Sequence, residues 1–214
     1  AKDMICTPQS VAAHSLYENA NPFELIEPDG VLNIAASQYH AVGSRRVKVT
    51  NSTFEPKTIK NAKLEGAIFH GYQSVIIGGI RDPLIIGQID DWTEKLRKRL
   101  KSRVHDVYGK APPPYHFNIS TYGKDAVMGD LEPIKKITSH EVGLVLEITS
   151  ESQEISNNII SLARHQALHL PIPEWSGLIT SFACRHSPSF LERGKVYKFT
   201  DNSLMETENP LDFF

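Results

Sequence analysis

A chain of 214 residues with 40% hydrophobic and 22% charged side chains is large enough to bury a sizeable core. Its formal net charge of −2 excludes a general attraction to nucleic acid or to an anionic membrane. No apolar run reaches the roughly 18 residues that cross a bilayer, and the first residues carry no signal-peptide core. Cys6 and Cys184 form no disulfide framework and suit a reducing compartment. The composition therefore predicts a cytoplasmic protein of mixed helix and sheet, with no membrane partner.

Residues 1–62 are expected to form a connecting region that packs on something else. Thr7 followed by Pro8 predicts the start of a short helix, because threonine caps helix N-termini and proline fits the first helical position. Short apolar pieces punctuated by proline and glycine follow, and RRVKVTNS alternates as a half-buried strand does. The apolar content of this region is thin for an independent core.

From residue 67 the pattern becomes regular. A strand over 67–81 precedes Asp82-Pro83, which predicts a helix start, and one apolar stripe then runs from Ile85 to Val104. Strands are predicted over 115–123 and 141–150. Ser150 with Gln153 predicts a capping box for a helix that runs to Pro171. A strand over 177–186 and a further one at KVYKFTDN complete the series.

This order predicts an α+β fold. The succession β-α-β-β-α-β plus one strand is typical of the ferredoxin-like plait, an antiparallel sheet with both helices on one face. We expect the plait over 63–204, preceded by the helix, loop and strand region 1–62 and followed by a tail over 205–214. The uncovered face of such a sheet predicts a homo-oligomer.

The stretch RHQALHL places His165 and His169 four residues apart on the predicted helix that runs to Pro171. Two histidines at this spacing can hold zinc, but Gln166 stands where a zinc peptidase needs its glutamate base. A third ligand is also required. We therefore predict no metal, with His165 and His169 as weak candidates, and favour two histidines that flank the apolar stripe near a helix C-terminus.

The stretch EKLRKRLKSR gathers six basic residues around the helix predicted after Asp82. They are either a surface for a polyanion, such as RNA or the phosphates of a coenzyme, or a solvated helix face. The second interpretation is favoured because the strands carry no recognisable aromatic RNA-binding motif. Nucleic acid is therefore an unlikely partner.

The segment IGGIRDPLIIGQIDD is chemically the most suggestive. Glycines at a strand end allow a close approach of another surface, and Arg81 with Asp82 follows at the turn. Asp82 is favoured as a helix cap. Asp90 and Asp91 point about 100° apart on a helix, so they do not easily share one small ligand. Cys184 is predicted to be a small buried residue.

Four segments together resemble the acyclic terpene utilisation family, the AtuA-type proteins: TPQSVAAHSLYENANPFEL, KLEGAIFHGYQSVIIGGIRDPLIIGQIDDW, HEVGLVLEITSESQEISNNIISLAR, and the terminal VYKF with ENPLDFF. The segment around GIRDP and IGQID is the most specific. The resemblance implies the C-terminal portion of such a protein, with a larger N-terminal α/β domain of which 1–62 is a remnant or extension. That domain, absent here, is the expected partner.

The resemblance also implies a function. AtuA-type proteins belong to the catabolism of acyclic terpenes and related branched acids, whose intermediates are coenzyme A thioesters, and a lyase-type step is one suggestion. The alternative is a non-catalytic ferredoxin-like module for oligomerisation or binding, and whether this chain is an enzyme stays open. No catalytic residue is assigned. The matched segment gives Arg81, Asp82, Gln88 and Asp90 as ligand-binding candidates. No cofactor is identified, and a coenzyme A thioester is expected only as substrate.

Overall fold

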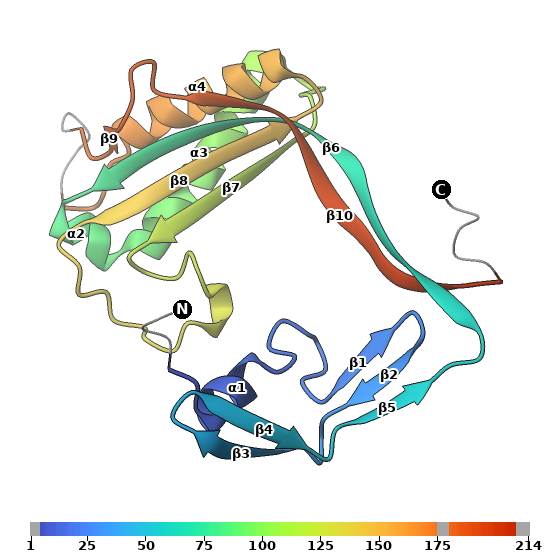
Figure 1. The fold of residues 1–214 in the computed structure, drawn as a ribbon. Helices are drawn as coiled ribbons and strands as arrows, with labels where there is room; N and C mark the ends of the chain where they lie inside the picture. The colour runs from blue at the N-terminus through green and yellow to red at the C-terminus, as the bar shows by residue number, and fades with distance from the viewer. Residues whose placement is uncertain (1–4, 175–179, 209–214) are drawn as a thin grey trace. The chain divides into compact units, whose positions relative to one another are not determined.

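The computed structural model describes residues 5–174 and 180–208, which belong to two compact units. The first unit comprises 1–67 with 199–214, and the second comprises 68–198. The sequence places the corresponding boundaries at 62/63 and 204/205. Two long strands, β6 (Lys60–Ile80) and β10 (Leu191–Thr207), contribute residues to both units (Figure 1).

The first unit combines one short helix with small sheets. Helix α1 (Pro8–His14) has the predicted Thr7 cap: the Thr7 hydroxyl accepts from the Ser10 amide at 3.1 Å, and the Ser10 hydroxyl accepts from the Thr7 amide at 2.9 Å. One antiparallel sheet has the order β1-β2-β5, and a separate hairpin pairs β3 with β4. The strands are β1 (Glu24–Glu27), β2 (Gly30–Asn33), β3 (Gln38–Gly43), β4 (Arg46–Thr50) and β5 (Thr53–Pro56).

The thin apolar content of this unit is visible in its burial. Gly30 and Asn61 are the only buried residues in the described part of the unit. Apolar side chains such as Phe54 and Ile59 are about half exposed, at 48% and 57%. The described residues of the unit therefore bury no apolar core of their own.

The second unit is built on a five-stranded sheet with the order β10-β6-β8-β7, and the short β9 (Ala183–Cys184) pairs with β6. Strand β8 (Val142–Ser150) runs antiparallel to both of its neighbours, β6 and β7 (Tyr115–Tyr122). Helices α3 (Ile89–Tyr108) and α4 (Gln153–Leu168) lie on one face of this sheet (Figure 1). The predicted mixture of helix and sheet, an α+β chain, is confirmed.

The core lies between the sheet and the two helices. Every second residue of β8 from Val142 to Ile148 is at most 1% exposed, as the alternation of a strand requires. The predicted stripe of α3 is confirmed, because it buries Ile89, Trp92, Leu96, Leu100 and Val104. Helix α4 buries Ile159, Ile160, Ala163 and Ala167, while Ile155 and Leu162 are only partly buried.

The single helix predicted after Asp82 is wrong, because the helix is broken at Gln88. Asp82 caps the short α2 (Pro83–Gly87), and its carboxylate accepts from the amides of Leu84 at 2.7 Å and Ile85 at 3.3 Å. The backbone of Gln88 has φ −129° and ψ 34°, outside the helical region, and α3 begins at the next residue. Gly87 directly precedes the break, and glycine is a poor helix former.

The predicted capping box of Ser150 and Gln153 is also wrong. Ser150 ends β8 and donates its hydroxyl to the carbonyl of Pro114 at 3.0 Å. Ser152 caps α4 instead, because its hydroxyl accepts from the Ile155 amide at 3.2 Å. The Gln153 amide group donates to Ser74 and Asn157 at 2.9 Å each, which ties the helix start to the sheet.

The C-terminal strands differ in length from their predictions. Of the strand predicted over 177–186, residues 177–179 lie outside the described residues, and the rest forms only the two-residue β9. The last strand starts at Leu191 and ends at Thr207, and so extends into the predicted tail. None of the helices in the described ranges is long and apolar enough to span a membrane.

Candidate anion-binding site

An open cavity of about 760 Å³ lies within the second unit, where β6 leads into α2 and α3. Its walls come from the C-terminal end of α2, the first turn of α3 and the connection 123–141 between β7 and β8. The apolar part of the wall is small and includes Ile86, Ile89 and Ile137. The polar part is dominated by cations: Arg81, Lys124, Lys135 and Lys136, with His140 beside them.

The connection that carries Lys124, Lys135 and Lys136 is held near both of its ends. Gly123 follows β7 with φ +91°, a conformation that favours glycine, and the Ser139 hydroxyl donates to its carbonyl at 3.4 Å. The carbonyl of Thr121 accepts from the amides of residues 124, 125 and 126 at 3.3, 3.2 and 3.1 Å. Ile137 packs against the core. Both ends of the connection are thus held to the sheet unit.

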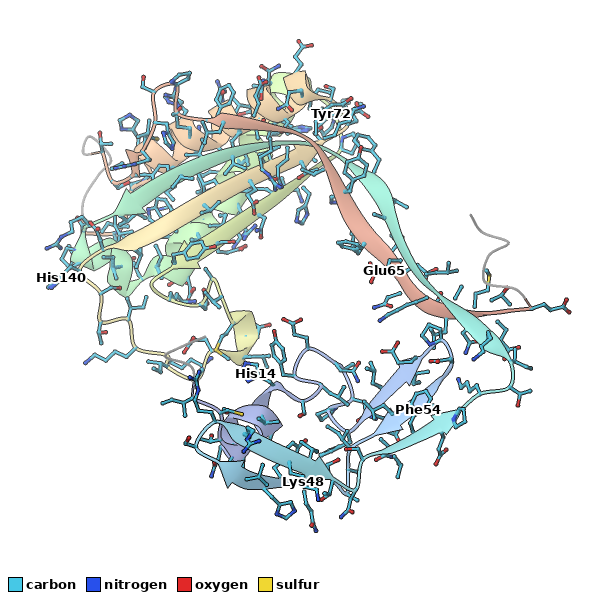
Figure 2. The ribbon with its side chains drawn as sticks, in the orientation of Figure 1. His14, Lys48, Phe54, Glu65, Tyr72 and His140 are labelled. Carbon is cyan, nitrogen blue, oxygen red and sulfur yellow. The ribbon has the colours of Figure 1, made fainter. Side chains whose placement is uncertain are left out.

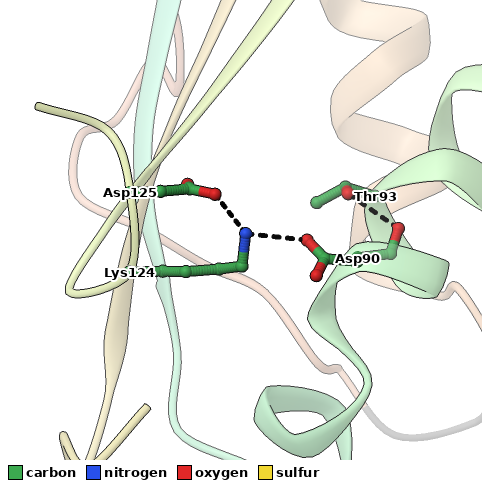
Figure 3. Close-up of polar contacts among 4 residues, drawn as sticks. All are labelled: Asp90, Thr93, Lys124 and Asp125. Atoms are coloured by element: carbon green, nitrogen blue, oxygen red, sulfur yellow. Dashed lines mark hydrogen bonds and ion pairs between the residues drawn. The ribbon is translucent and has the colours of Figure 1, made fainter. Parts of the chain in front are cut away.

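Lys124 lies between two carboxylates (Figure 3). Its ammonium is 2.9 Å from Asp90 on α3 and also contacts Asp125, and its side chain is only 20% exposed. Burial alone lowers the pKa of Lys124, but the hydrogen bonds and charges of Asp125 and Asp90 outweigh it, so the pKa is raised. Lys124 is therefore a permanent cation at neutral pH and not a base.

Three other cations of the cavity have no such partner. The side chains of Arg81, Lys135 and Lys136 are exposed, and none forms an ion pair or hydrogen bond with the described residues. His140 is also exposed and stands at the end of the connection (Figure 2).

The cavity is therefore a local concentration of positive charge. Its lining carries four cations against the carboxylates of Asp90 and Asp91, and Asp125 beside Lys124 adds a third carboxylate. The excess positive charge therefore comes from Arg81, Lys135 and Lys136, although the chain as a whole has a net charge of −2. Such a site attracts anions, and arginine and lysine are the side chains that bind carboxylates and phosphates in proteins.

The structure brings together three of the four ligand-binding candidates. Arg81, Gln88 and Asp90 line the cavity, whereas Asp82 does not, because its carboxylate caps α2. The Gln88 amide group donates to the Leu84 carbonyl at 3.0 Å and to the Glu174 carboxylate at 3.1 Å. A single helix starting after Asp82 would place Asp90 about two turns from its start. The break at Gln88 places it in the first turn of α3 instead.

Sequence reasoning missed Lys124, Lys135, Lys136 and His140. All four lie in the connection 123–141, which has no hydrophobic periodicity apart from its junctions with the strands. One signal was present: connections longer than about 15 residues are uncommon between antiparallel strands and are often functional. A basic pair in such a connection marks it as a binding loop.

The same connection exposes an unusual run of apolar side chains. Val127, Leu131 and Ile134 are 87%, 80% and 70% exposed, and Met128 is 49% exposed. Ile134 directly precedes Lys135 in the chain, and the other three lie four to eight residues before it. Exposed apolar side chains gathered in one segment mark interaction surfaces, so the connection offers an apolar surface together with its cations.

The two histidines of α4 are exposed neighbours. The rings of His165 and His169 lie 6.1 Å apart at an interplanar angle of 81°, and His169 is the residue that ends the helix. Among the described residues, no three histidine, cysteine or acidic side chains come close enough to hold a metal ion. Any metal on this pair would therefore need ligands from elsewhere.

The six basic residues of α3 make different contacts and do not form one free basic surface. Lys95 donates to the carbonyl of Pro171 at 2.5 Å, and Arg97 donates to the carbonyl of Phe117 at 2.7 Å while lying over its ring. Lys98 pairs with Glu94, and Arg103 pairs with Asp106. Only Arg99 and Lys101 of the six are exposed without a polar partner among the described residues.

Comparison with known proteins assigns the chain to a family. The model of the family described as "acyclic terpene utilisation family protein AtuA" matches residues 2–174, which is most of the chain. The matched range contains the whole cavity. None of the curated proteins matches the chain, and none of the solved structures does. By the extent of the family match, the chain belongs to the acyclic terpene utilisation family, AtuA.

Proposed function

We propose that this chain acts in acyclic terpene utilisation by binding a branched acyl intermediate as its coenzyme A thioester, with the phosphate groups in the cationic cavity. The observation that carries the proposal is the set of unpaired cations Arg81, Lys135 and Lys136 around one cavity, in a chain of net negative charge. A coenzyme A thioester presents several phosphate charges on one molecule, which such a set can neutralise together.

The apolar side chains of the connection support an acyl chain on the same ligand. Val127, Leu131 and Ile134 expose apolar surface eight, four and one residues before Lys135 in the same connection. Burial of such surface stabilises a complex by about 25 cal/mol per Å². A ligand with an anionic part and a branched apolar chain uses both features.

In a lyase-type step at this cavity, Lys124 is not the group that accepts a proton. A lyase step on a thioester needs a group that accepts a proton. The raised pKa of Lys124 keeps this side chain protonated, because Asp125 and Asp90 hold its ammonium against the opposing effect of burial. Lys124 therefore serves as a fixed positive charge, and we propose that the described cavity holds the thioester.

The fold proposed for residues 68–198 is the ferredoxin-like plait. The central strands of this sheet, β6 and β8, are the first and third long strands of the unit, and the edge strands β7 and β10 are the second and fourth. A helix follows each central strand, and both helices lie on one face. A cytoplasmic location is part of the proposal and fits the two free cysteines.

Isothermal titration calorimetry tests the function. We expect dimethyloctanoyl-coenzyme A, which has an acyclic monoterpene skeleton, to bind more tightly than coenzyme A alone, and dimethyloctanoate alone to bind weakest. Lys135→Gln with Lys136→Gln should weaken the binding of both coenzyme A ligands about tenfold or more, with a smaller salt dependence. Mass spectrometry of the incubated thioester would detect cleavage and so reveal a lyase step.

The control for the lysine variant is Lys101→Gln with Lys110→Gln, which removes the same two charges from exposed lysines outside the cavity. Equal affinity of the Lys135 and Lys136 double variant and the wild-type protein would contradict the cavity assignment. No binding of either coenzyme A ligand by the wild-type protein would contradict the proposed ligand class.

A further inference from the structure

A second cavity of the sheet unit, of about 470 Å³, lies between the end of α4 and the segment that contains β9. It shares no lining residue with the cationic cavity. Arg164 of α4 contributes the positive charge of its wall, and Cys184 of β9 contributes a thiol. The apolar part of its wall includes Leu168, Phe182 and Phe190.

Arg164 has no compensating partner in the described part of the chain: no carboxylate and no hydrogen-bond acceptor is paired with its guanidinium there. Among the residues that line this cavity there is no aspartate or glutamate. Its other polar groups are His186 and hydroxyls such as those of Ser187 and Ser189, which can donate to an anion.

The charge of Arg164 reaches the sulfur of Cys184. Burial raises the pKa of the Cys184 thiol, and the positive charge of Arg164 acts in the opposite direction and lowers it. A guanidinium that influences the thiol electrostatically also acts on any anion that approaches the sulfur. Two chemically different groups, the guanidinium and the thiol, therefore face the same space.

We infer that this second cavity binds a small carboxylate with an apolar chain, with the carboxylate on Arg164 and the chain against Leu168, Phe182 and Phe190, next to Cys184. Guanidinium is the side-chain group whose fork of N–H donors matches a carboxylate. The apolar residues favour an alkyl carboxylic acid over inorganic phosphate. This site goes beyond the proposed function, which uses other residues.

Alkylation of the cysteines tests whether an anion binds next to Cys184. Iodoacetate and iodoacetamide both form a carbon–sulfur bond with the thiolate and release iodide, but only iodoacetate carries a carboxylate. The ratio of their rates at one cysteine is independent of the fraction of thiolate, because both reagents react with the same group. Peptide mass spectrometry gives this ratio separately for Cys184 and Cys6.

We expect the ratio of the iodoacetate rate to the iodoacetamide rate to be on the order of tenfold higher at Cys184 than at Cys6. The reason is that a localised positive charge raises the local concentration of an anion. Arg164→Gln should bring the ratio at Cys184 down to that at Cys6. The matched control is Arg185→Gln, which removes an arginine next to Cys184 that does not line the cavity and should leave the ratio high.

A second measurement uses the wild-type protein alone. Butanoate should slow the alkylation of Cys184 by iodoacetamide and leave Cys6 unaffected, whereas the neutral butanamide should protect neither cysteine. Equal rate ratios at the two cysteines, an unchanged ratio in Arg164→Gln, or equal protection by butanoate and butanamide would each overturn the inference. Protection by inorganic phosphate in place of butanoate would overturn the assignment of the ligand class.

Discussion

Lys124 is the least exposed cation of the first cavity, and its ion pair with Asp90 should make the stability of the sheet unit depend on pH. A raised lysine pKa means that the folded protein holds this proton more tightly than the unfolded chain. The stabilisation is therefore complete below the ordinary value of 10.5 and is lost as the pH rises through the folded pKa. We expect the free energy of unfolding to fall as the pH rises above 10.5.

Asp90→Asn removes one cause of this shift. Because the Asp90 side chain is 77% exposed, solvent weakens the pair, and we expect a loss of only about 0.5 kcal/mol at pH 8, measured by urea denaturation. The decrease in stability at alkaline pH should also become smaller. Asp91→Asn is the matched control, since Asp91 lies on the same turn and pairs with no described residue. The same loss in both variants would contradict a specific pair.

Substitutions of Asp82 test whether this residue caps a helix or binds a ligand. Its carboxylate accepts two amides at the start of α2, so Asp82→Ala should lower the free energy of unfolding by about 1 kcal/mol. Asp82→Asn should restore most of that loss, because asparagine caps helices as well as aspartate does. Thermal and urea unfolding of the two variants measure this difference. If Asp82→Asn is as unstable as Asp82→Ala, the carboxylate charge acts elsewhere.

At the scale of elements, the two glycines at the end of β6 have different roles. A Cβ on Gly78 would lie 2.3 Å from the ring of Phe182, which is fully buried, and 2.7 Å from the carbonyl of Ala183. A Cβ on Gly79 would meet only the Val142 carbonyl at 3.5 Å, an ordinary contact. The close approach predicted from the sequence therefore occurs at Gly78, where β9 pairs with β6.

We expect Gly78→Ala to destabilise the sheet unit by about 1–3 kcal/mol, because the added methyl group forces Phe182 and the β9 backbone to move. Gly79→Ala is the control in the adjacent position and should change the free energy of unfolding by less than about 0.5 kcal/mol. Urea denaturation with a far-ultraviolet signal compares the two variants. Equal stability would show that the contact between β6 and β9 adjusts without cost.

The elements that the sequence predicts best are those with local signals. The Asp82-Pro83 start, the stripe from Ile89 to Val104 and the alternation of β8 each follow from residues a few positions apart. The break at Gln88 and the shift of the cap from Ser150 to Ser152 depend on how the helices meet the sheet. A local pattern does not contain that information.

The site is harder to predict than the fold for a related reason. Arg81, Gln88 and Asp90 lie in one segment that the family resemblance marks, and the structure places them in one cavity. Lys124 and Lys135 come from a connection without periodicity, and only the pairing of β7 with β8 brings both of its ends to α3. Long-range pairing of this kind is set by the whole sheet.

At the scale of the whole molecule, the sheet of the second unit has helices on one face only (Figure 1). Ile76 and Leu146 are fully buried toward the helices, so their neighbours Ile77 and Val145, which face each other across β6 and β8, point to the other face. Ile77 is 40% exposed. On the same face Asn118 donates to the Glu147 carboxylate at 2.8 Å, so part of the hydrogen-bonding capacity of this carboxylate is met within the chain.

We expect this face to join two copies of the chain, because burial of Ile77 and Val145 is favourable and the Asn118–Glu147 pair lowers the cost of removing polar groups from water. Sedimentation equilibrium should show a dimer that dissociates on dilution, and Ile77→Lys should shift the protein to monomer by placing a charge in the interface. Val107→Lys adds the same charge to an exposed site on α3 and should leave the dimer intact. A monomeric mass of the wild-type protein at high concentration would contradict association through the sheet, and the exposed isoleucine would then need another partner.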